Sequence, residues 1–219
     1  GIVMEDCMDI FLNDSEMAGN AKDGVVLEDC ARTIVGNNTI RDNGRDGIFS
    51  DDSWNIDISN NTIESNAEDG LRERDVYGCK VADNIIREND RHGIYSWDTD
   101  ADDYWILRNQ ILGNGRDGIR YAMPEDDRRS GGHNGRWYDT ELWLTDNEIK
   151  NNEGWGIYID DPWRDIYTEL RSEGTTSITN NPVFLGDGDA IVAPEGRLNT
   201  NAAEFYMKGG FGLFVEAGG

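Results

Sequence analysis

Hydrophobic and polar positions recur along this chain at a fixed interval of 23 residues. The clearest unit is NNTIRDNGRDGI, residues 37–48, and its pattern Asn-x-Ile-x-x-Asn-x-x-Asp-Gly-Ile returns along most of the sequence. The first five copies of its glycine are each 23 residues apart: Gly1, Gly24, Gly47, Gly70 and Gly93. The next two copies, Gly118 and Gly156, follow after 25 and 38 residues, so the later repeats carry insertions. A fixed period of this length is typical of proteins built from one stacked structural unit.

Three positions of the repeat, counted from the glycine, are nearly always aliphatic. Position 2 is Ile2, Val25, Ile48, Leu71, Ile94, Ile119, Ile157 and Ile191; position 12 is Leu12, Val35, Ile58, Val81, Ile106, Leu144 and Ile178; position 17 is Met17, Ile40, Ile63, Ile86, Ile111, Ile149 and Val183. Short segments rich in β-branched residues, each with one main inward residue, predict three strands per repeat. No segment holds the 3.6-residue apolar period of a helix. We therefore expect an all-β fold, a single-stranded parallel β-helix of about seven to eight coils with three short strands each.

Two further columns of the repeat are asparagine. Position 15 is Asn38, Asn61, Asn84, Asn109, Asn147 and Asn181, and position 20 is Asn20, Asn43, Asn66, Asn89, Asn114 and Asn152. A buried amide is costly unless it is paired, and amides stacked about 4.8 Å apart can bond to one another along the column. We interpret both columns as structural ladders. The Asp-Gly pairs before position 2 predict tight turns in which glycine takes a positive φ.

The repeat N-x-I-x-x-N-x-x-D/H-G-I resembles the repeats of the pectate-lyase-like superfamily of right-handed parallel β-helices. That superfamily includes polysaccharide lyases, hydrolases, mannuronan C5-epimerases and NosD-like periplasmic proteins. The resemblance extends from Gly1 to about Asp189. It implies a right-handed coil and a polysaccharide-related role outside the cell or at its surface. One such architecture hosts many activities, so function has to be argued from the outward residues.

The unbroken repeat predicts one elongated domain over residues 1–189, with coils that start at residues 1, 24, 47, 70, 93, 118 and 156. Residues 190–219 lose the repeat and become apolar and glycine-rich, which predicts a partial last coil followed by a C-terminal cap or an oligomer interface. The chain starts on a repeat glycine without a cap, and an exposed strand edge invites pairing with other chains. We therefore expect a homo-oligomer or a larger assembly through the ends of the rod.

The charge excludes several classes of partner. The chain has 44 acidic and 20 basic residues, and its formal charge is −24. Such a surface repels nucleic acid and anionic membranes, and no apolar run is long enough to insert into a membrane. An acid excess with few lysines also suggests a halophilic protein, whose self-repulsion is screened by salt. Cys7 and Cys30 share position 7 of adjacent coils, which is compatible with a disulfide or with a reduced pair.

The candidate site lies on the strand that follows each glycine. Position 2 faces inward, so positions 3 and 5 should face outward. In the fourth to seventh coils these positions gather cations and rings: Arg72, Arg74, Tyr95, Trp97, Arg120 and Tyr158. Aromatic faces stack on sugar rings, and arginine forks grip carboxylates. We interpret this zone as a groove for an acidic polysaccharide. The alternative is that the arginines only pair with acidic neighbours across the rungs.

Further substrate contacts are expected around this zone. The candidates are Asp51, Arg91, Trp97, Tyr121, Trp137 and Tyr158. Trp137 lies in the longest insertion, roughly residues 122–139, and a second long loop covers residues 160–177. Both loops enter beside the outward face, where they could form the walls of a groove.

Candidate catalytic residues follow from one short resemblance and from chemistry. The segment Asp90-Arg91-His92-Gly93 resembles a tetrapeptide of alginate C5-epimerases. The resemblance implies that Arg91 binds a carboxylate and that His92 contacts substrate or transfers a proton. The alternative is that His92 is a turn residue filling the Asp position. Proton removal beside a uronate carboxylate needs a neutralising cation and a base within reach, so the candidate set is Arg72, Arg74, His92, Tyr95 and Arg120.

The sequence also departs from that family. The epimerases carry an Asp-Pro-His segment whose Asp and His point outward, whereas this chain has Phe49 and Asp51 at the corresponding places and no Asp-Pro-His at all. A separate cofactor candidate is Ca²⁺, since Asp98, Asp100 and Asp102 alternate in one loop. An acidic, solvated loop is the alternative there. The alternative for the whole chain is a non-catalytic shaft, such as a segment of a surface layer, adhesin or viral tail spike.

Overall fold

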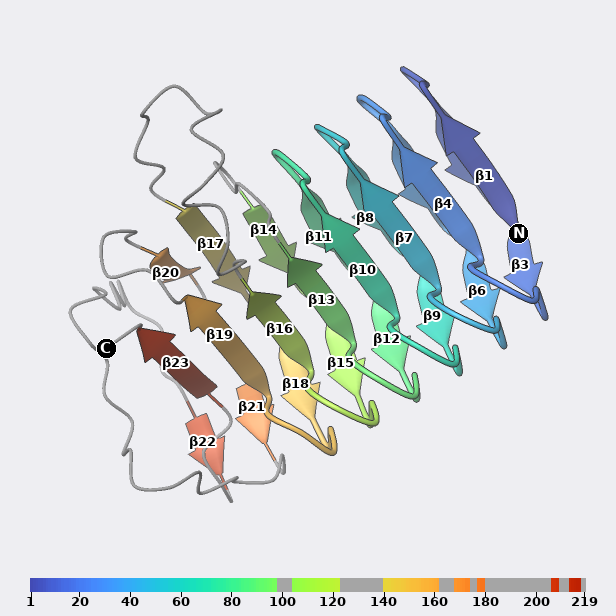
Figure 1. Cartoon of the computed structure of the whole chain (residues 1–219). Coiled ribbons are helices and arrows are strands. Elements are labelled where there is room, and N and C mark those ends of the chain that lie inside the picture. The colour runs from blue at the N-terminus through green and yellow to red at the C-terminus, as the bar shows by residue number, and fades with distance from the viewer. Residues whose placement is uncertain are drawn as a thin grey trace.

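The computed structural model describes residues 1–97, 104–122, 140–161, 168–173, 177–179, 206–208 and 213–217, and every regular element in this part is a β-strand. The strands form three parallel sheets that run side by side along one rod, with β1 at one end of the first sheet and β23 at the other (Figure 1). The absence of a long apolar period from the sequence accounts for the absence of helices from these residues. The all-β, right-handed parallel β-helix is therefore confirmed.

The first sheet is built from the strand that follows each repeat glycine. Its strands are β1 (Ile2–Glu5), β4 (Val25–Glu28), β7 (Ile48–Asp51), β10 (Leu71–Arg74), β13 (Ile94–Trp97), β16 (Ile119–Ala122), β19 (Ile157–Asp161) and β23 (Leu213–Ala217). Its register follows the repeat, because Val25 pairs with Ile48, Ile48 with Leu71 and Leu71 with Ile94. Residues one period apart thus lie directly above one another.

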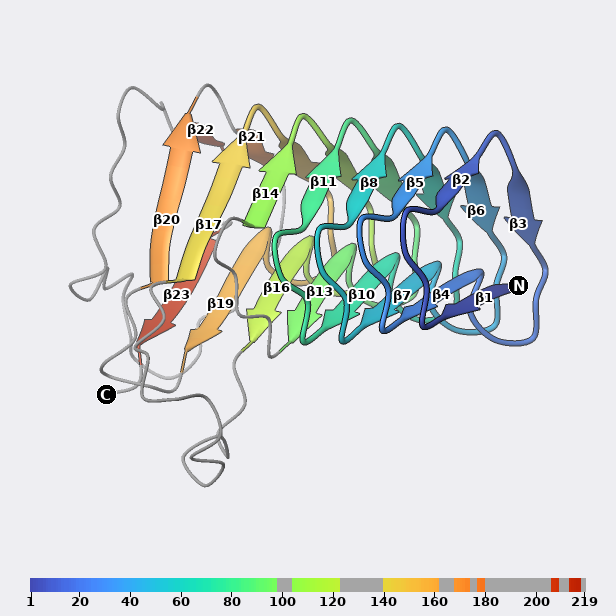
Figure 2. The same cartoon turned by 90° about the horizontal axis from the view of Figure 1, so that it is seen from above.

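The other two sheets continue each coil. The second sheet contains β2 (Phe11–Asn13), β5 (Ile34–Gly36), β8 (Asp57–Ser59), β11 (Lys80–Ala82), β14 (Tyr104–Leu107), β17 (Thr140–Thr145) and β20 (Thr168–Glu173). The third contains β3 (Glu16–Ala18), β6 (Thr39–Arg41), β9 (Thr62–Glu64), β12 (Ile85–Arg87), β15 (Gln110–Leu112), β18 (Glu148–Lys150), β21 (Ser177–Thr179) and β22 (Tyr206–Lys208). Figure 2 shows the first and second sheets extending along the same axis. The regular turns number about five, slightly fewer than predicted, and the last strands extend the sheets beyond them.

Where burial is described, most strands of the second and third sheets contribute one inward apolar residue to the core, and β14 contributes Tyr104 and Ile106. The strands of the first sheet turn positions 2 and 4 inward. Positions 2, 12 and 17 are buried as predicted, for example Ile48, Ile58 and Ile63. Position 4 is also buried, because alternate residues of a strand point to the same face. Tyr121 holds this position in β16 and has no exposed surface, so its prediction as a substrate contact is wrong.

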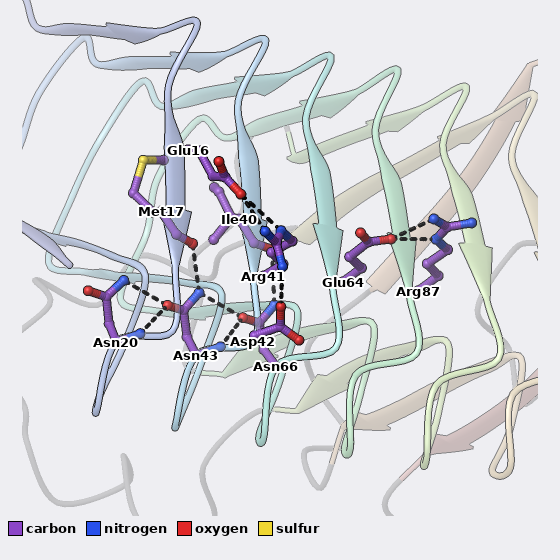
Figure 3. A network of polar contacts seen from close by, with 10 residues as sticks. All are labelled: Glu16, Met17, Asn20, Ile40, Arg41, Asp42, Asn43, Glu64, Asn66 and Arg87. Atoms are coloured by element: carbon purple, nitrogen blue, oxygen red, sulfur yellow. Dashed lines mark hydrogen bonds and ion pairs between the residues drawn. The ribbon is translucent and has the colours of Figure 1, made fainter.

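Stacked asparagines line two corners of the coil. Asn61 Nδ2 donates to Asn84 Oδ1 at 3.1 Å and to the carbonyl oxygen of Val35 at 2.8 Å, while its Oδ1 accepts from the backbone N–H of Asn38. The second stack includes Asn20, Asn43 and Asn66, whose bonds are visible in Figure 3. Each buried amide is therefore paired with its neighbours and with the backbone, as expected for a buried polar group.

The glycines of the Asp-Gly turns act by a different mechanism from the one predicted. Their φ is not positive; among the described glycines only Gly19, Gly78 and Gly113 have that conformation. A Cβ on Gly70 would instead lie 2.6 Å from Ile86 Cγ2 and 2.7 Å from Asn89 Nδ2. Glycine is needed there because the end of its own coil and the carbonyl oxygen of Gly93 in the next coil pack directly against its Cα.

Acidic and amide side chains occupy many of the strained turn positions. Asp6, Asp29, Asp52 and Asp75 stand at one corner of successive coils, and each has a φ between 45° and 52°. Asp and Asn tolerate this left-handed region better than most residues, since their short side chains bond locally. Part of the acid excess is therefore a requirement of the turns.

Two further expectations can be compared with the structure. The three cysteines are free, so of the two alternatives for Cys7 and Cys30 the reduced pair is observed. Cys30 Sγ lies 3.4 Å from the carbonyl oxygens of Met4 and Glu28, and its burial, with a hydrogen bond to Cys7, raises the pKa of the thiol to about 11. Within the described residues no helix is long and apolar enough to cross a membrane.

Candidate functional site

The outward face of the first sheet carries a column of alternating rings and guanidinium groups. Strand register places five position-3 residues on successive rungs: Phe49, Arg72, Tyr95, Arg120 and Tyr158. We call this set the Arg–aromatic column. All five are half-buried, so each side chain retains an exposed part. The predicted grouping of position-3 residues is therefore present in the structure.

The members of the column contact one another. The guanidinium carbon of Arg72 lies 5.6 Å from the ring centroid of Phe49 and 5.8 Å from that of Tyr95. The guanidinium carbon of Arg120 lies 4.4 Å from the ring centroid of Tyr158. At these distances each cation is attracted by the ring quadrupole. The rings thus restrict the conformations of the arginine side chains along the column.

Buried carboxylates support both arginines from the turn that precedes the sheet. Arg72 Nη1 lies 3.9 Å from Asp46 Oδ2, and Arg120 Nη1 lies 3.4 Å from Asp117 Oδ2. Burial raises the pKa of Asp46 to about 7, and the charges of Asp69 and Asp23 act in the same direction. Burial would also raise the pKa of Asp117, but His92, the backbone N–H of Trp155 and the charge of Arg120 together lower that pKa. Asp117 is therefore ionised at neutral pH, whereas Asp46 is close to half-protonated.

Position 5 forms a second, shorter column on the same face. Arg74 donates through Nε to Asp51 Oδ1 at 2.6 Å and through Nη2 to Asp51 Oδ2. This bidentate pair raises the pKa of Arg74 and occupies both oxygens of Asp51. Asp51 and Arg74 were each predicted as site residues, but the structure shows them paired with each other, as in the alternative interpretation. Trp97 follows them on the next rung and is half-buried.

His92 belongs to a column of buried acceptors at the turn. The side chains of Asp23, Asp46 and Asp69 each accept a hydrogen bond from the backbone N–H one coil later, at 2.9–3.1 Å. His92 Nδ1 does the same for the N–H of Asp117 at 3.2 Å. His92 therefore fills the structural role of the aspartates, which sequence reasoning had kept as an alternative.

The environment of His92 limits its chemistry. The ring is 5% exposed, and its Nδ1 also lies 3.3 Å from Asp117 Oδ2. Because Nδ1 is engaged by Asp117, Nε2 is the ring nitrogen left for another partner. The ring centroid lies 5.3 Å from that of Tyr95, so Tyr95, His92 and Asp117 form a connected group beside Arg120. In this group Tyr95 is half-buried, whereas His92 and Asp117 are buried.

Arg91 is separate from the column. It lies in the turn before β13, and its Nη1 donates to Glu68 Oε2 at 3.5 Å. Glu68 also lies 4.0 Å from Arg45, so an acidic residue stands between two arginines along this corner. Ion pairs at the surface contribute little to the free energy of unfolding. The predicted carboxylate-binding role of Arg91 stays a prediction.

Four predicted residues lie outside the described part of the chain. They are Trp137 of the long insertion and the proposed Ca²⁺ ligands Asp98, Asp100 and Asp102. A different acidic group lies within the described residues, where carboxylate oxygens of Asp51, Asp52 and Asp75 come within 4.8 Å of one another. Sequence reasoning missed it, although positions 5 and 6 of adjacent coils would have brought these residues together.

A family model for the right handed beta helix region matches residues 1–123. The chain belongs to this family. Among solved structures, the A-module of the Azotobacter vinelandii mannuronan C-5 epimerase AlgE6 is similar in fold, with 16% identity, a TM-score of 0.56, 93% of this chain covered and 58% of that one. The AlgE4 A-module of the same organism gives 16% identity, a TM-score of 0.46, and coverage of 80% and 54%. This chain thus spans little more than half of either epimerase module, and no curated protein matches it in sequence.

Proposed function

We propose that this β-helix binds an acidic polysaccharide along the Arg–aromatic column. The observation that carries the proposal is the in-register alternation of guanidinium groups and rings on a chain whose net charge is −24. A cationic and aromatic zone on such an acidic protein selects anionic, ring-containing ligands from the solvent. A long polymer suits the zone because the column continues over five rungs.

The two residue types contribute different parts of the affinity. A guanidinium fork donates two parallel hydrogen bonds to a carboxylate or sulfate, and ring faces cover the apolar side of a sugar. Asp117 and Asp46 hold the arginines from below, so less side-chain freedom is lost on binding. The similarity in fold to a mannuronan epimerase module is consistent with a polysaccharide ligand. With such a ligand, we propose that the protein acts outside the cell or at its surface.

Binding measurements on three arginine variants test this proposal. Isothermal titration with alginate and other uronate polymers, in low salt and without added calcium, should give a measurable affinity for the wild type. Arg72→Ala and Arg120→Ala should each weaken it by on the order of tenfold, as expected for loss of a charge-assisted contact. Arg87→Ala is the control, because it removes an arginine that also pairs with a carboxylate, but from β12 on the third sheet.

Each possible result has a clear meaning. Equal affinities for the wild type and the two column variants would contradict the proposal. No binding to any acidic polymer, together with self-association of the rods, would favour the structural shaft instead. Repeating the titration with added Ca²⁺ tests the metal ion that the sequence suggested.

A second candidate is a lyase- or epimerase-like reaction on a bound uronate, and the contact between Tyr95 and His92 beside Arg120 favours it. Arg120 would neutralise the carboxylate and Tyr95 would remove the adjacent proton. In a lyase the resulting electron pair forms a C=C bond and expels the glycosidic oxygen; in an epimerase a proton returns to the opposite face. Absorbance of the unsaturated product detects the first outcome, and solvent deuterium on the carbon that regains a proton detects the second. Tyr95→Phe should abolish either signal while oligosaccharide binding remains.

A further inference from the structure

The spacing of the two arginines along the Arg–aromatic column indicates how the charged sugars of a bound polymer are spaced. Arg72 and Arg120 are not neighbours, because Tyr95 pairs with Arg72 on one side and with Arg120 on the other. Two rungs of a parallel sheet separate their Cα atoms by about 9.6 Å. A (1→4)-linked sugar advances by about one rung. The two cations are therefore placed to meet anionic groups on every second sugar.

The rung between the two arginines is aromatic on its whole outward surface. Tyr95 and Trp97 are the outward residues of β13, and both are half-buried. The buried ring of His92 lies 5.3 Å from that of Tyr95 and supports it from the preceding turn. The rings of Tyr95 and Trp97 supply no cation for a carboxylate, and their apolar surface packs against the C–H groups of an uncharged sugar. This rung suits a neutral sugar better than an acidic one.

The same alternation continues at both ends of the column. Phe49 pairs with Arg72 on the side toward the N-terminus, and Tyr158 pairs with Arg120 on the other side. Below Phe49 the position-3 residue is Val26, which is uncharged. The order along the column is thus ring, cation, ring, cation, ring.

We propose that this column selects an alternating glycan, in which one acidic sugar is followed by one neutral sugar. The inference rests on the proposed function, since it assumes that a glycan occupies this face. It adds the class of polymer: the carboxylates of the acidic sugars pair with Arg72 and Arg120, and the intervening neutral sugar lies on Tyr95 and Trp97. A homopolymer of uronic acid would place a charged sugar at this rung, where the outward residues of β13 supply no cation.

The direct test compares oligosaccharides of equal length and different charge spacing. Hexasaccharides in which glucuronate alternates with N-acetylglucosamine should bind the wild type more tightly than hexamannuronate or hexagalacturonate, by on the order of fivefold. This order should hold even though the homopolymers carry twice the charge. Equal or tighter binding of the homopolymers would overturn the inference while leaving the proposed function in place. No binding of either kind would overturn both.

A variant that fills the middle rung provides an independent readout. Tyr95→Arg creates three cations on consecutive rungs, so it should raise the affinity for the uronate homopolymers and remove the preference for the alternating glycan. Tyr77→Arg is the control, since it adds the same charge at an exposed turn outside the first sheet. A preference that persists unchanged in Tyr95→Arg would also overturn the inference.

Discussion

At the scale of single residues, buried carboxyl groups determine how the protein responds to pH. Glu73 is fully buried at position 4 of β10; its Oε1 accepts a hydrogen bond from Cys79 Sγ at 2.9 Å, and its Oε2 accepts one from the Tyr104 hydroxyl. Burial raises the pKa of Glu73 to about 7, although both hydrogen bonds act in the opposite direction. Asp46, beneath Arg72, has its pKa raised to about the same value. The titration of Glu73 should affect the stability of the fold, and that of Asp46 should affect ligand binding.

Glu73 should make the folded state less stable as the pH rises. Its pKa is higher in the folded chain than in the unfolded chain, where it is near 4.5, so its contribution is complete below about pH 4.5 and is lost as the pH rises through 7. Glu73→Gln keeps the size and removes the titration. The free energy of unfolding of the wild type should fall relative to the variant between pH 4.5 and 8, by up to about 3 kcal/mol. Parallel pH profiles in urea titrations would contradict this.

Asp46 should make polymer binding pH-dependent. Protonated Asp46 leaves the charge of Arg72 uncompensated, whereas ionised Asp46, 3.9 Å away, competes with the ligand. Affinity for an acidic oligosaccharide should therefore decrease as the pH rises from 6 to 8. In Asp46→Asn the amide oxygen can still accept from the N–H of Asp69, so the variant should bind with an affinity that stays flat over this range. If the affinity of Asp46→Asn still decreases as the pH rises from 6 to 8, another group causes the pH dependence.

At the scale of elements, the repeat register controls both the stability and the site. The glycine spacing and the period-2 alternation were sufficient to predict which residues stack and that positions 3 and 5 face outward. Tyr121 is the exception: its aromatic side chain suits a sugar contact, but position 4 points inward and the side chain is buried. The pairing of Arg74 with Asp51 and the support of Arg72 by Asp46 could not be predicted, since they depend on the rotamers of long side chains.

The asparagine stacks should be the most sensitive elements to substitution. Asn61→Ala removes the acceptor of the Asn38 N–H and side chain, and it leaves Asn84 Oδ1 with only the backbone N–H of residue 61 as a donor. Several buried polar groups then lose partners at once, so the variant should lose on the order of 3 kcal/mol of unfolding free energy. Gln110→Ala, at an exposed position of β15, should change it by less than about 0.5 kcal/mol. Urea denaturation followed by circular dichroism compares the two, and a similar small loss in both would contradict the role assigned to the stack.

At the scale of the whole molecule, a narrow cationic face interrupts an acidic rod. Self-repulsion from a charge of −24 should be screened as the Debye length falls from about 10 Å at 0.1 M to 3 Å at 1 M salt. We expect the melting temperature to rise between these two salt concentrations. Affinity for an acidic polymer should fall over the same interval, because its contacts are charged. A melting temperature that falls with added salt would contradict the halophilic interpretation.

The central claim is that an acidic glycan lies on the Arg–aromatic column. A crystal structure of the protein with a bound acidic hexasaccharide tests it most directly. The account predicts a sugar ring over Tyr95, with acidic groups of the glycan within hydrogen-bonding distance of Arg72 and Arg120. A glycan bound on the second or third sheet, with both arginines still turned only toward Asp46 and Asp117, would contradict it.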